Sequence, residues 1–234
     1  TTASNNTAVG YASLAANTTG AQNTAVGEGA LGANTTASYN TALGENALAS
    51  NTTGTQNVAV GQATLDTNTT GDNNTAVGRD ALTANTTADN NTAVGKAALT
   101  ANTTGAFNTG LGVGALQSNT TSDLNTAVGK SALFANTTGA SNVAIGANAL
   151  DANTTASNNT AVGYDALTAN TTGTRNVSLG AYSLDVNTTA HDNTGLGYAT
   201  LSANITGTAN TAVGAEALLS NTASNNTAVG NDAL

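Results

Sequence analysis

Apolar and polar residues alternate along this chain in a pattern that repeats every 17 residues. The pattern opens with Asn-Thr-Ala-Val-Gly, and fourteen copies of this segment or a close variant occur between Asn6 and Gly230. With its first Asn taken as position 1, the repeat always has Asn at position 1, Gly at position 5, Leu at position 9 and Asn at position 12. A fixed period of this kind is typical of solenoids, whose repeats bury their apolar side chains against their neighbours.

The exchanges at the start of the repeat predict a β-strand and the direction in which its side chains face. Position 2 is Thr or, as at Val58, Val, and position 4 is always Val, Leu or Ile. These β-branched and aliphatic residues favour a strand, in which alternate residues share a face. We therefore expect positions 2 and 4 to face the core, together with Leu at position 9 and Thr at position 13, which is Ile only at Ile205. Positions 6 to 12 are compatible with a further strand or with one helical turn.

Together these features predict an all-β fold, a parallel β-solenoid with one 17-residue repeat per turn and about 14 rungs, formed by residues 1–234 as one repeat domain. Equivalent residues then stack about 4.8 Å apart, the spacing of hydrogen-bonded strands. We expect the Asn of positions 1 and 12 to form ladders of side-chain amides, and the Gly of position 5 to permit a corner. The chain begins and stops within a repeat, so we expect it to be a segment of a longer fibre or to stack end to end.

The same alternation would turn the small residue of position 3 outward. A long uncharged strip of this kind marks a partner surface, so we expect lateral self-association, as a homotrimer or a filament. The alanines expected to form the strip are Ala8, Ala25, Ala42, Ala59, Ala76, Ala93, Ala127, Ala144 and Ala161.

Composition narrows the classes of partner. Only 7% of the residues are charged and the net charge is -9, which disfavours binding to nucleic acid or to anionic lipid. No apolar run is long enough to be inserted in a membrane, and no Cys is present to form a disulfide or thiolate site. We expect no cofactor and no metal, because the acidic residues, such as Asp72 with Asp89 and Asp151 with Asp185, are scattered among the repeats and suit a solubilising role.

Other candidate sites are weak. His191 is the single histidine and stands at the variable position 16, which favours a solvated loop residue, so we expect no enzymatic activity. The glycines around Leu111 occupy ordinary repeat positions and lack the helix that a phosphate site needs. Every Asn-Thr-Thr is formally an N-glycosylation sequence, although a structural ladder explains the same recurrence.

The motif Asn142-Val143-Ala144-Ile145-Gly146 resembles the repeat of trimeric autotransporter adhesin heads, and related repeats resemble those of phage and virus tail fibres. This resemblance implies a parallel β-roll that forms trimers and is displayed on a cell or virion surface for attachment. The adhesin-head repeat is shorter than 17 residues and lacks the Asn-Thr-Thr element, so the shape of the rung is expected to differ.

From these observations we expect a structural and adhesive fibre segment, located outside the cell or on a cell or virion surface. Its receptor, a cell-surface glycan or a protein, is expected to contact Tyr164, Tyr182 and Tyr198, which stand at positions 6, 7 and 6 of successive repeats. The alternative is ice binding through ranks of Thr and Asn. Neighbouring Thr residues of Asn-Thr-Thr point to opposite sides of a strand, however, so that element offers a single outward rank.

Overall fold

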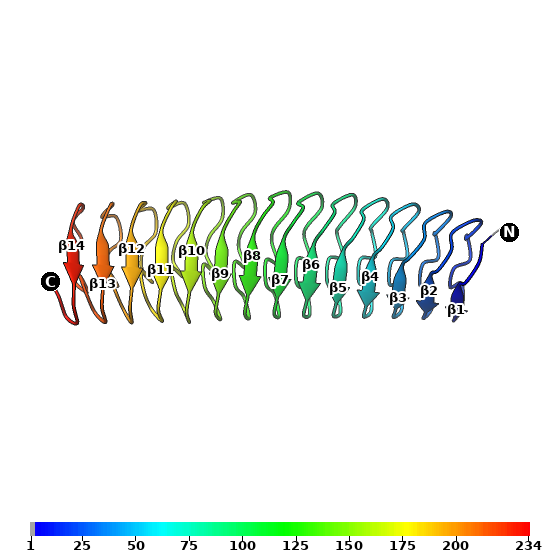
Figure 1. The fold of residues 1–234 in the computed structure, drawn as a ribbon, viewed down its shortest axis with the longest axis horizontal. Helices are drawn as coiled ribbons and strands as arrows, with labels where there is room; N and C mark the ends of the chain where they lie inside the picture. The colour runs from blue at the N-terminus through cyan, green and yellow to red at the C-terminus, as the bar shows by residue number, and fades with distance from the viewer. Residues whose placement is uncertain (1–2) are drawn as a thin grey trace. The chain divides into compact units, whose positions relative to one another are not determined.

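The computed structural model describes residues 3–234 and contains strands and turns, with no helix in that range (Figure 1). Each repeat contributes one strand of three residues at positions 2 to 4. The strands are β1 (Thr7–Val9), β2 (Thr24–Val26), β3 (Thr41–Leu43), β4 (Val58–Val60), β5 (Thr75–Val77), β6 (Thr92–Val94), β7 (Thr109–Leu111), β8 (Thr126–Val128), β9 (Val143–Ile145), β10 (Thr160–Val162), β11 (Val177–Leu179), β12 (Thr194–Leu196), β13 (Thr211–Val213) and β14 (Thr227–Val229). The prediction of an all-β parallel solenoid is confirmed.

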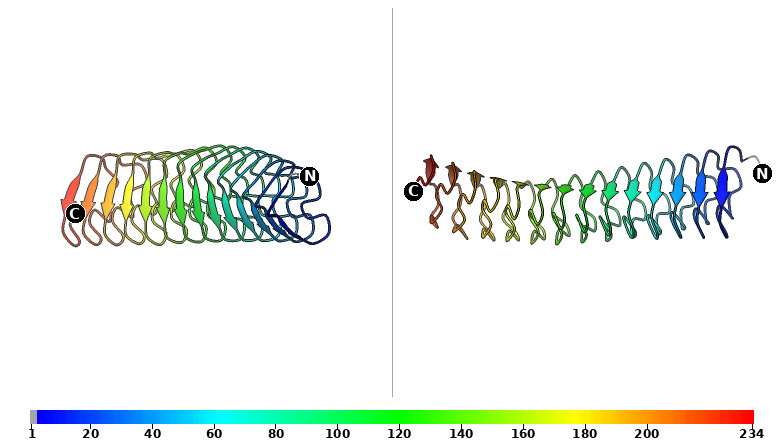
Figure 2. Two further views of the ribbon diagram at one scale, coloured as in Figure 1. Left: turned by 45° about the vertical axis from the view of Figure 1, so that its right-hand side comes forward. Right: turned by 90° about the horizontal axis from the view of Figure 1, so that it is seen from below.

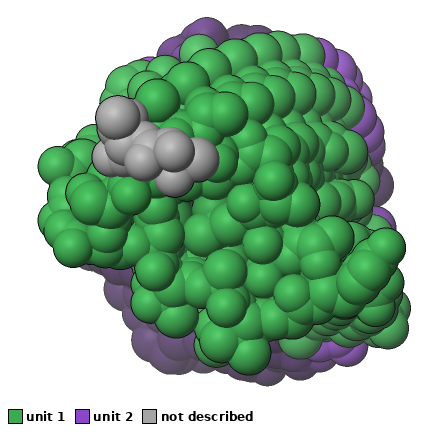
Figure 3. Space-filling view, turned by 90° about the vertical axis from the view of Figure 1, so that its right-hand side faces the viewer, with its two compact units in different colours: residues 1–123 green, residues 124–234 purple. Residues whose placement is uncertain are grey.

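The chain forms two compact units, one ending at Asp123 and one beginning at Leu124. The first unit contains β1 to β7 and the second β8 to β14, and in each unit consecutive strands pair in parallel. The register joins equivalent positions, as in the pairing of Ala76 with Ala93. Equivalent side chains of the first unit consequently form rows, visible in its space-filling view (Figure 3).

Outside the short strands, the backbone of each turn is still bonded to the next turn. The amide of Leu14 donates to the carbonyl of Ala30, and that of Leu31 to Ala47, both over 3.0 Å. The position-9 leucines therefore stack at the interval expected from the sequence, and Leu31, Leu48 and their equivalents through Leu201 are fully buried. The strands line one side of each turn of the chain (Figure 2), and this leucine lies in the turn segment that follows position 5.

Two ladders of asparagine amides close the corner of each turn. At position 1 the backbone amide of Asn40 donates to Oδ1 of Asn23 over 3.0 Å, and at position 12 Nδ2 of Asn34 donates to Oδ1 of Asn17 over 2.9 Å. The two ladders also share a carbonyl acceptor in each turn. Nδ2 of Asn23 and Nδ2 of Asn34 both donate to the carbonyl oxygen of Ala37, over 2.8 and 3.1 Å. The ladders expected from the sequence are confirmed, and they satisfy most of the buried asparagine amides; the exceptions are the unpartnered Oδ1 atoms of Asn187 and Asn204.

The glycine of position 5 occupies a backbone conformation that other residues avoid. Its φ angle lies between 125° and 141° in every repeat. A Cβ placed on Gly95 would lie 2.5 Å from the carbonyl oxygen of Gly112 in the next turn. Both the dihedral angle and the contact exclude a side chain, as the sequence predicts.

The predicted facing of the strand is wrong. Position 3 is buried, and positions 2 and 4 carry the side chains that point to solvent. The cause is the narrow core, because a Cβ added to Gly110 at position 3 would already lie 3.4 Å from Cγ of Leu99. The alanines expected on the surface are instead fully buried at Ala25, Ala42, Ala59, Ala76, Ala93, Ala127, Ala144 and Ala161, and only Ala8, in the first turn, is exposed.

Position 13 is also not in the core. Its Thr residues are partly exposed, and Ile205 is 51% exposed. The hydroxyl of Thr52 donates to the carbonyl of Thr69 over 3.0 Å, and most other Thr residues of this position repeat that bond. The constancy of Thr here therefore reflects a hydrogen bond between turns and not burial.

Candidate functional site

The outward side of the strands forms an uncharged face on each unit. We call it the threonine–valine face. It consists of positions 2 and 4, namely Thr24, Thr41, Val58, Thr75, Thr92 and Thr109 with Val26, Leu43, Val60, Val77, Val94 and Leu111 in the first unit, and Thr126, Val143, Thr160, Val177, Thr194 and Thr211 with Val128, Ile145, Val162, Leu179, Leu196 and Val213 in the second.

Aliphatic side chains on this face are unusually accessible. Leu43, Leu111 and Ile145 are 46%, 43% and 39% exposed, and no charged residue stands at positions 2 to 4 of any repeat. The threonine hydroxyls of the face make no hydrogen bond to any residue between 3 and 234. The face therefore presents a rank of free hydroxyls beside a rank of aliphatic side chains, repeated at the spacing of the strands.

The tyrosines singled out from the sequence do come together in the second unit. Tyr164 and Tyr182 meet edge to face with ring centroids 5.4 Å apart, and Tyr182 and Tyr198 do so at 5.9 Å. Their exposed fractions are 48%, 37% and 53%. Stacking between turns thus aligns positions 6 and 7, and it forms an aromatic cluster accessible to solvent.

Carboxylates surround this cluster. Asp165 raises the pKa of the neighbouring Tyr164 hydroxyl by its charge, with Tyr182 adding to the effect, and accepts a hydrogen bond from Nδ2 of Asn148 over 2.9 Å. Burial, followed by the charge of Asp165, raises the pKa of Asp151, and burial is also the main cause of the raised pKa of Asp185. The carboxylates Asp151 and Asp185 are two turns apart, so they do not form the close pair that acid–base catalysis or metal binding requires.

Other acidic residues have a structural role that the sequence did not reveal. Oδ1 of Asp72 accepts the backbone amide of Thr55 over 2.6 Å, and Oδ1 of Asp89 accepts that of Asp72 over 2.7 Å. Ser38 makes the equivalent bond to Ala21. Position 16 thus favours a short side chain with an acceptor, because that side chain bonds a backbone amide of the preceding turn.

His191 lies at the surface, as expected. Its Nδ1 is 2.6 Å from Oδ2 of Asp192, and Asp192 also binds the guanidinium of Arg175 through two hydrogen bonds of 2.7 and 2.9 Å. The Arg175 guanidinium, with His191, holds the pKa of Asp192 well below its usual range. All three side chains are exposed, and this ion pair joins one turn to the next without enclosing any space for a substrate.

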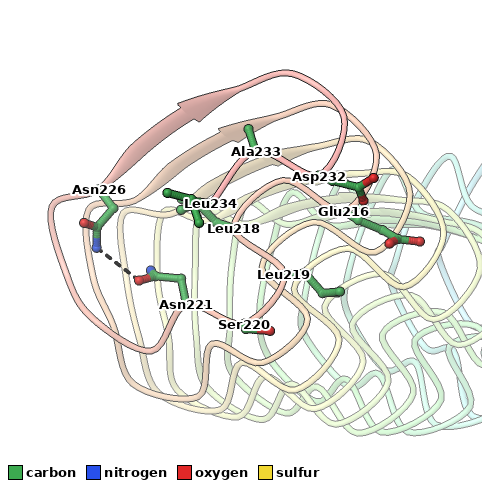
Figure 4. A pocket seen from close by; sticks show the side chains of 9 residues that line it. All are labelled: Glu216, Leu218, Leu219, Ser220, Asn221, Asn226, Asp232, Ala233 and Leu234. Atoms are coloured by element: carbon green, nitrogen blue, oxygen red, sulfur yellow. Dashed lines mark hydrogen bonds between the residues drawn. The ribbon is translucent and has the colours of Figure 1, made fainter.

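A cavity of about 500 Å³ opens at the last turn of the second unit (Figure 4). Its polar lining includes Asn221 and Asn226, whose Oδ1 and Nδ2 atoms are 3.2 Å apart, and the carboxylates Glu216 and Asp232.

Residues 3–234 contain no group of three or more potential metal ligands among His, Cys, Asp and Glu. In the same range no helix has the length and hydropathy of a membrane span.

Comparison with protein-family models, curated proteins and solved structures finds no match. Only the surfaces of the chain itself therefore point to a function. The threonine–valine face is the surface that sequence reasoning missed. The signal for it was present, since position 3 accepts only Ala, Gly and Ser and position 4 accepts branched residues of several sizes. Position 3 accepts smaller residues than position 4, and it is the buried position of the two.

Proposed function

We propose that this chain is a structural segment of an adhesive fibre, outside the cell or on a cell or virion surface, and that copies associate laterally as a homotrimer through the threonine–valine face. The observation that carries the proposal is an uncharged rank of aliphatic residues in every turn, in which the Leu and Ile residues are exposed and the Val residues of the interior turns are partly exposed. A contiguous apolar patch of this kind on a soluble protein usually marks an interface. The resemblance to adhesin heads and tail fibres supports the same role.

The ladders explain how such a segment stays rigid without a cofactor. Within each unit, each turn is joined to the next by backbone bonds, by two asparagine ladders and by stacked leucines. The stability of a solenoid is roughly the sum of these nearest-neighbour terms. Every turn therefore contributes to the stiffness of its unit. The variable positions remain available for contact with a receptor.

The test is the mass of the particle in solution. The full chain should elute as a multiple of 22.5 kDa in size-exclusion chromatography with light scattering. The double substitution Val77→Lys and Val162→Lys places a charge on the face of each unit and should yield monomers. Thr70→Lys with Thr155→Lys is the matched control, because these residues are exposed at position 14, away from the face. A monomeric wild-type chain, or an assembly unaffected by the two lysines on the face, would refute lateral association.

Ice binding is the second candidate, favoured by the free hydroxyls of the same face. Of the predicted rank, the second Thr of Asn-Thr-Thr is exposed, as at Thr87, whereas the Asn of the same element is buried in its ladder, as at Asn85. The Thr residues of position 2 are also available, about 4.8 Å apart from turn to turn, except where Val58, Val143 and Val177 interrupt the rank. Thermal hysteresis from a monomeric chain that is lost with Val77→Lys and Val162→Lys would favour ice binding over the fibre role.

For adhesion, we propose that Tyr164, Tyr182 and Tyr198 contact a cell-surface glycan or a protein receptor. Tyrosine provides a large, rigid and amphipathic contact surface, and here three rings form one cluster. Replacement of all three by Ala should weaken binding to target cells. Replacement of Tyr11 and Tyr39, which are exposed but isolated in the first unit, provides the control. Equal binding by both variants would exclude the cluster as the contact.

A further inference from the structure

The chain carries three kinds of N-glycosylation sequence, which differ in exposure. The first kind is Asn-Thr-Thr, or Asn-Ile-Thr at Asn204, and it begins at position 12 of each repeat from Asn17 to Asn204. The second is Asn-Asn-Thr, beginning just before position 1 and ending on the Thr of position 2. It occurs at Asn5, Asn73, Asn90, Asn158 and Asn225.

We propose that the folded chain accepts N-linked sugar on the exposed Asn of Asn-Asn-Thr and not on the buried Asn of Asn-Thr-Thr. The donor is a sugar whose anomeric carbon is esterified to phosphate. In the transfer, Nδ2 of the asparagine forms a bond to the anomeric carbon, the bond from that carbon to the phosphate oxygen breaks, and the phosphate-bearing group leaves with the electron pair. One proton of Nδ2 passes to a base of the transferase. The amide must therefore be reachable and have an N–H that is free.

At position 12 neither condition holds. Nδ2 of Asn85 donates one hydrogen bond to Oδ1 of Asn68 over 2.8 Å and another to the carbonyl of Ala88 over 3.1 Å. Both of its N–H groups are thus occupied, and Asn85 is 0% exposed. The asparagines of position 12 from Asn34 to Asn204 are equally buried. A sugar on any of them would have to displace the adjoining turn.

At position 17 the environment is the opposite. Asn73, Asn90 and Asn158 are exposed, and their side chains form no hydrogen bond to any residue between 3 and 234. Their backbones are held in the left-handed region, with φ of 57°, 59° and 62°, which Asn tolerates better than most residues. The amide consequently projects from a turn into solvent.

A third sequence, Asn176-Val177-Ser178, is closed by the same criteria. Nδ2 of Asn176 donates to the carbonyl of Ala190 over 2.8 Å, and the hydroxyl of Ser178 donates to the carbonyl of Ser183 over 2.7 Å. Both Asn176 and Ser178 are fully buried. An acceptor sequence in this chain can therefore be either exposed or buried. The exposure of its Asn decides whether that Asn is glycosylated.

The experiment uses the full folded chain, a purified soluble N-glycosyltransferase and nucleotide-activated glucose. Trypsin cleaves after Arg79 and Lys96, so one peptide, residues 80–96, contains both Asn85 and Asn90, and fragmentation in the mass spectrometer locates the hexose. We expect Asn90 to be modified at least about ten-fold faster than Asn85, because Asn85 reacts only in molecules whose turn has opened locally. In the heat-unfolded chain both residues should be modified at similar rates.

Two variants make the test sharper. Asn90→Gln should remove the hexose from this peptide of the folded chain. Gln22→Asn gives residues 22–24 the sequence Asn-Asn-Thr at an exposed left-handed position, with φ of 58°, and should add one modified site. The proposal is overturned if Asn85 of the folded chain is modified as fast as Asn90. It is also overturned if Asn90 is modified only after unfolding.

Discussion

Within one repeat, the invariant residues Asn74, Gly78 and Asn85 differ sharply from Arg79 and Asp80, which follow Gly78 in the chain. The invariant residues are the same in every repeat, whereas positions 6 and 7 carry charged, aromatic, polar and small residues. Backbone demand does not explain the difference, since position 7 has a positive φ angle throughout, 60° at Asp80. What differs is the neighbour. Each invariant residue packs against the same residue in the adjacent turns. A substitution would therefore disturb the contacts with both neighbouring turns, and the amino acid at that position stays the same.

The largest expected effect comes from breaking the corner at position 5. Gly95→Ala would place a Cβ 2.5 Å from the carbonyl oxygen of Gly112, at a φ angle of 133°. Because backbone on both sides must move, we expect a loss of about 4 kcal/mol in the free energy of unfolding, measured with urea. Gly32→Ala is the control at variable position 10, where Ala15 and Ala49 already occur, and it should be neutral within about 0.5 kcal/mol. Equal losses for both would contradict the comparison.

The next effect comes from the stacked leucines. Leu133→Ala removes a fully buried side chain between two equivalent leucines and leaves a cavity, so a loss of about 3 kcal/mol is expected. The adjacent Phe134 is larger but stands at variable position 10 and is 36% exposed. Phe134→Ala should cost less than half as much. Urea unfolding of the two variants settles the order, and a larger loss at Phe134 would show that volume matters more than position.

Breaking one member of an asparagine ladder should have an intermediate effect. Asn85→Ala removes donors to Asn68 and Ala88 and leaves Nδ2 of Asn102 without its acceptor, which is 3.2 Å away. We expect a loss of about 2 kcal/mol, since buried polar groups are left unpaired. Amide hydrogen exchange should accelerate in this turn and its two neighbours. Thr87→Ala, an exposed residue of the same turn, should leave both stability and exchange unchanged.

The same comparison explains what the sequence revealed. Leu at position 9, Asn at positions 1 and 12 and Gly at position 5 were correctly assigned, because invariance directly reports contact between copies. The orientation of the strand was not, because exchange of Thr for Val58 was interpreted as burial, whereas both residues suit a partly exposed face. The hydrogen bond that Asp89 accepts from the preceding turn was also not predicted. It depends on the distance between successive turns, which no short stretch of sequence specifies.

The smallest expected effect tests the variable side of the comparison. Position 17 has a positive φ angle in each repeat. It holds a bulky aromatic residue at Phe107, where φ is 58°, and asparagine at Asn73 and Asn90. Phe107 is 59% exposed, so its ring contributes little packing to offset the unfavourable dihedral angle. Phe107→Asn should therefore stabilise the chain by about 0.5 kcal/mol. Phe107→Ala, which lacks the preference of Asn for this region, should not. If Asn destabilises the protein more than Ala does, the phenylalanine ring makes a stabilising contact, and position 17 is selected for its side chain after all.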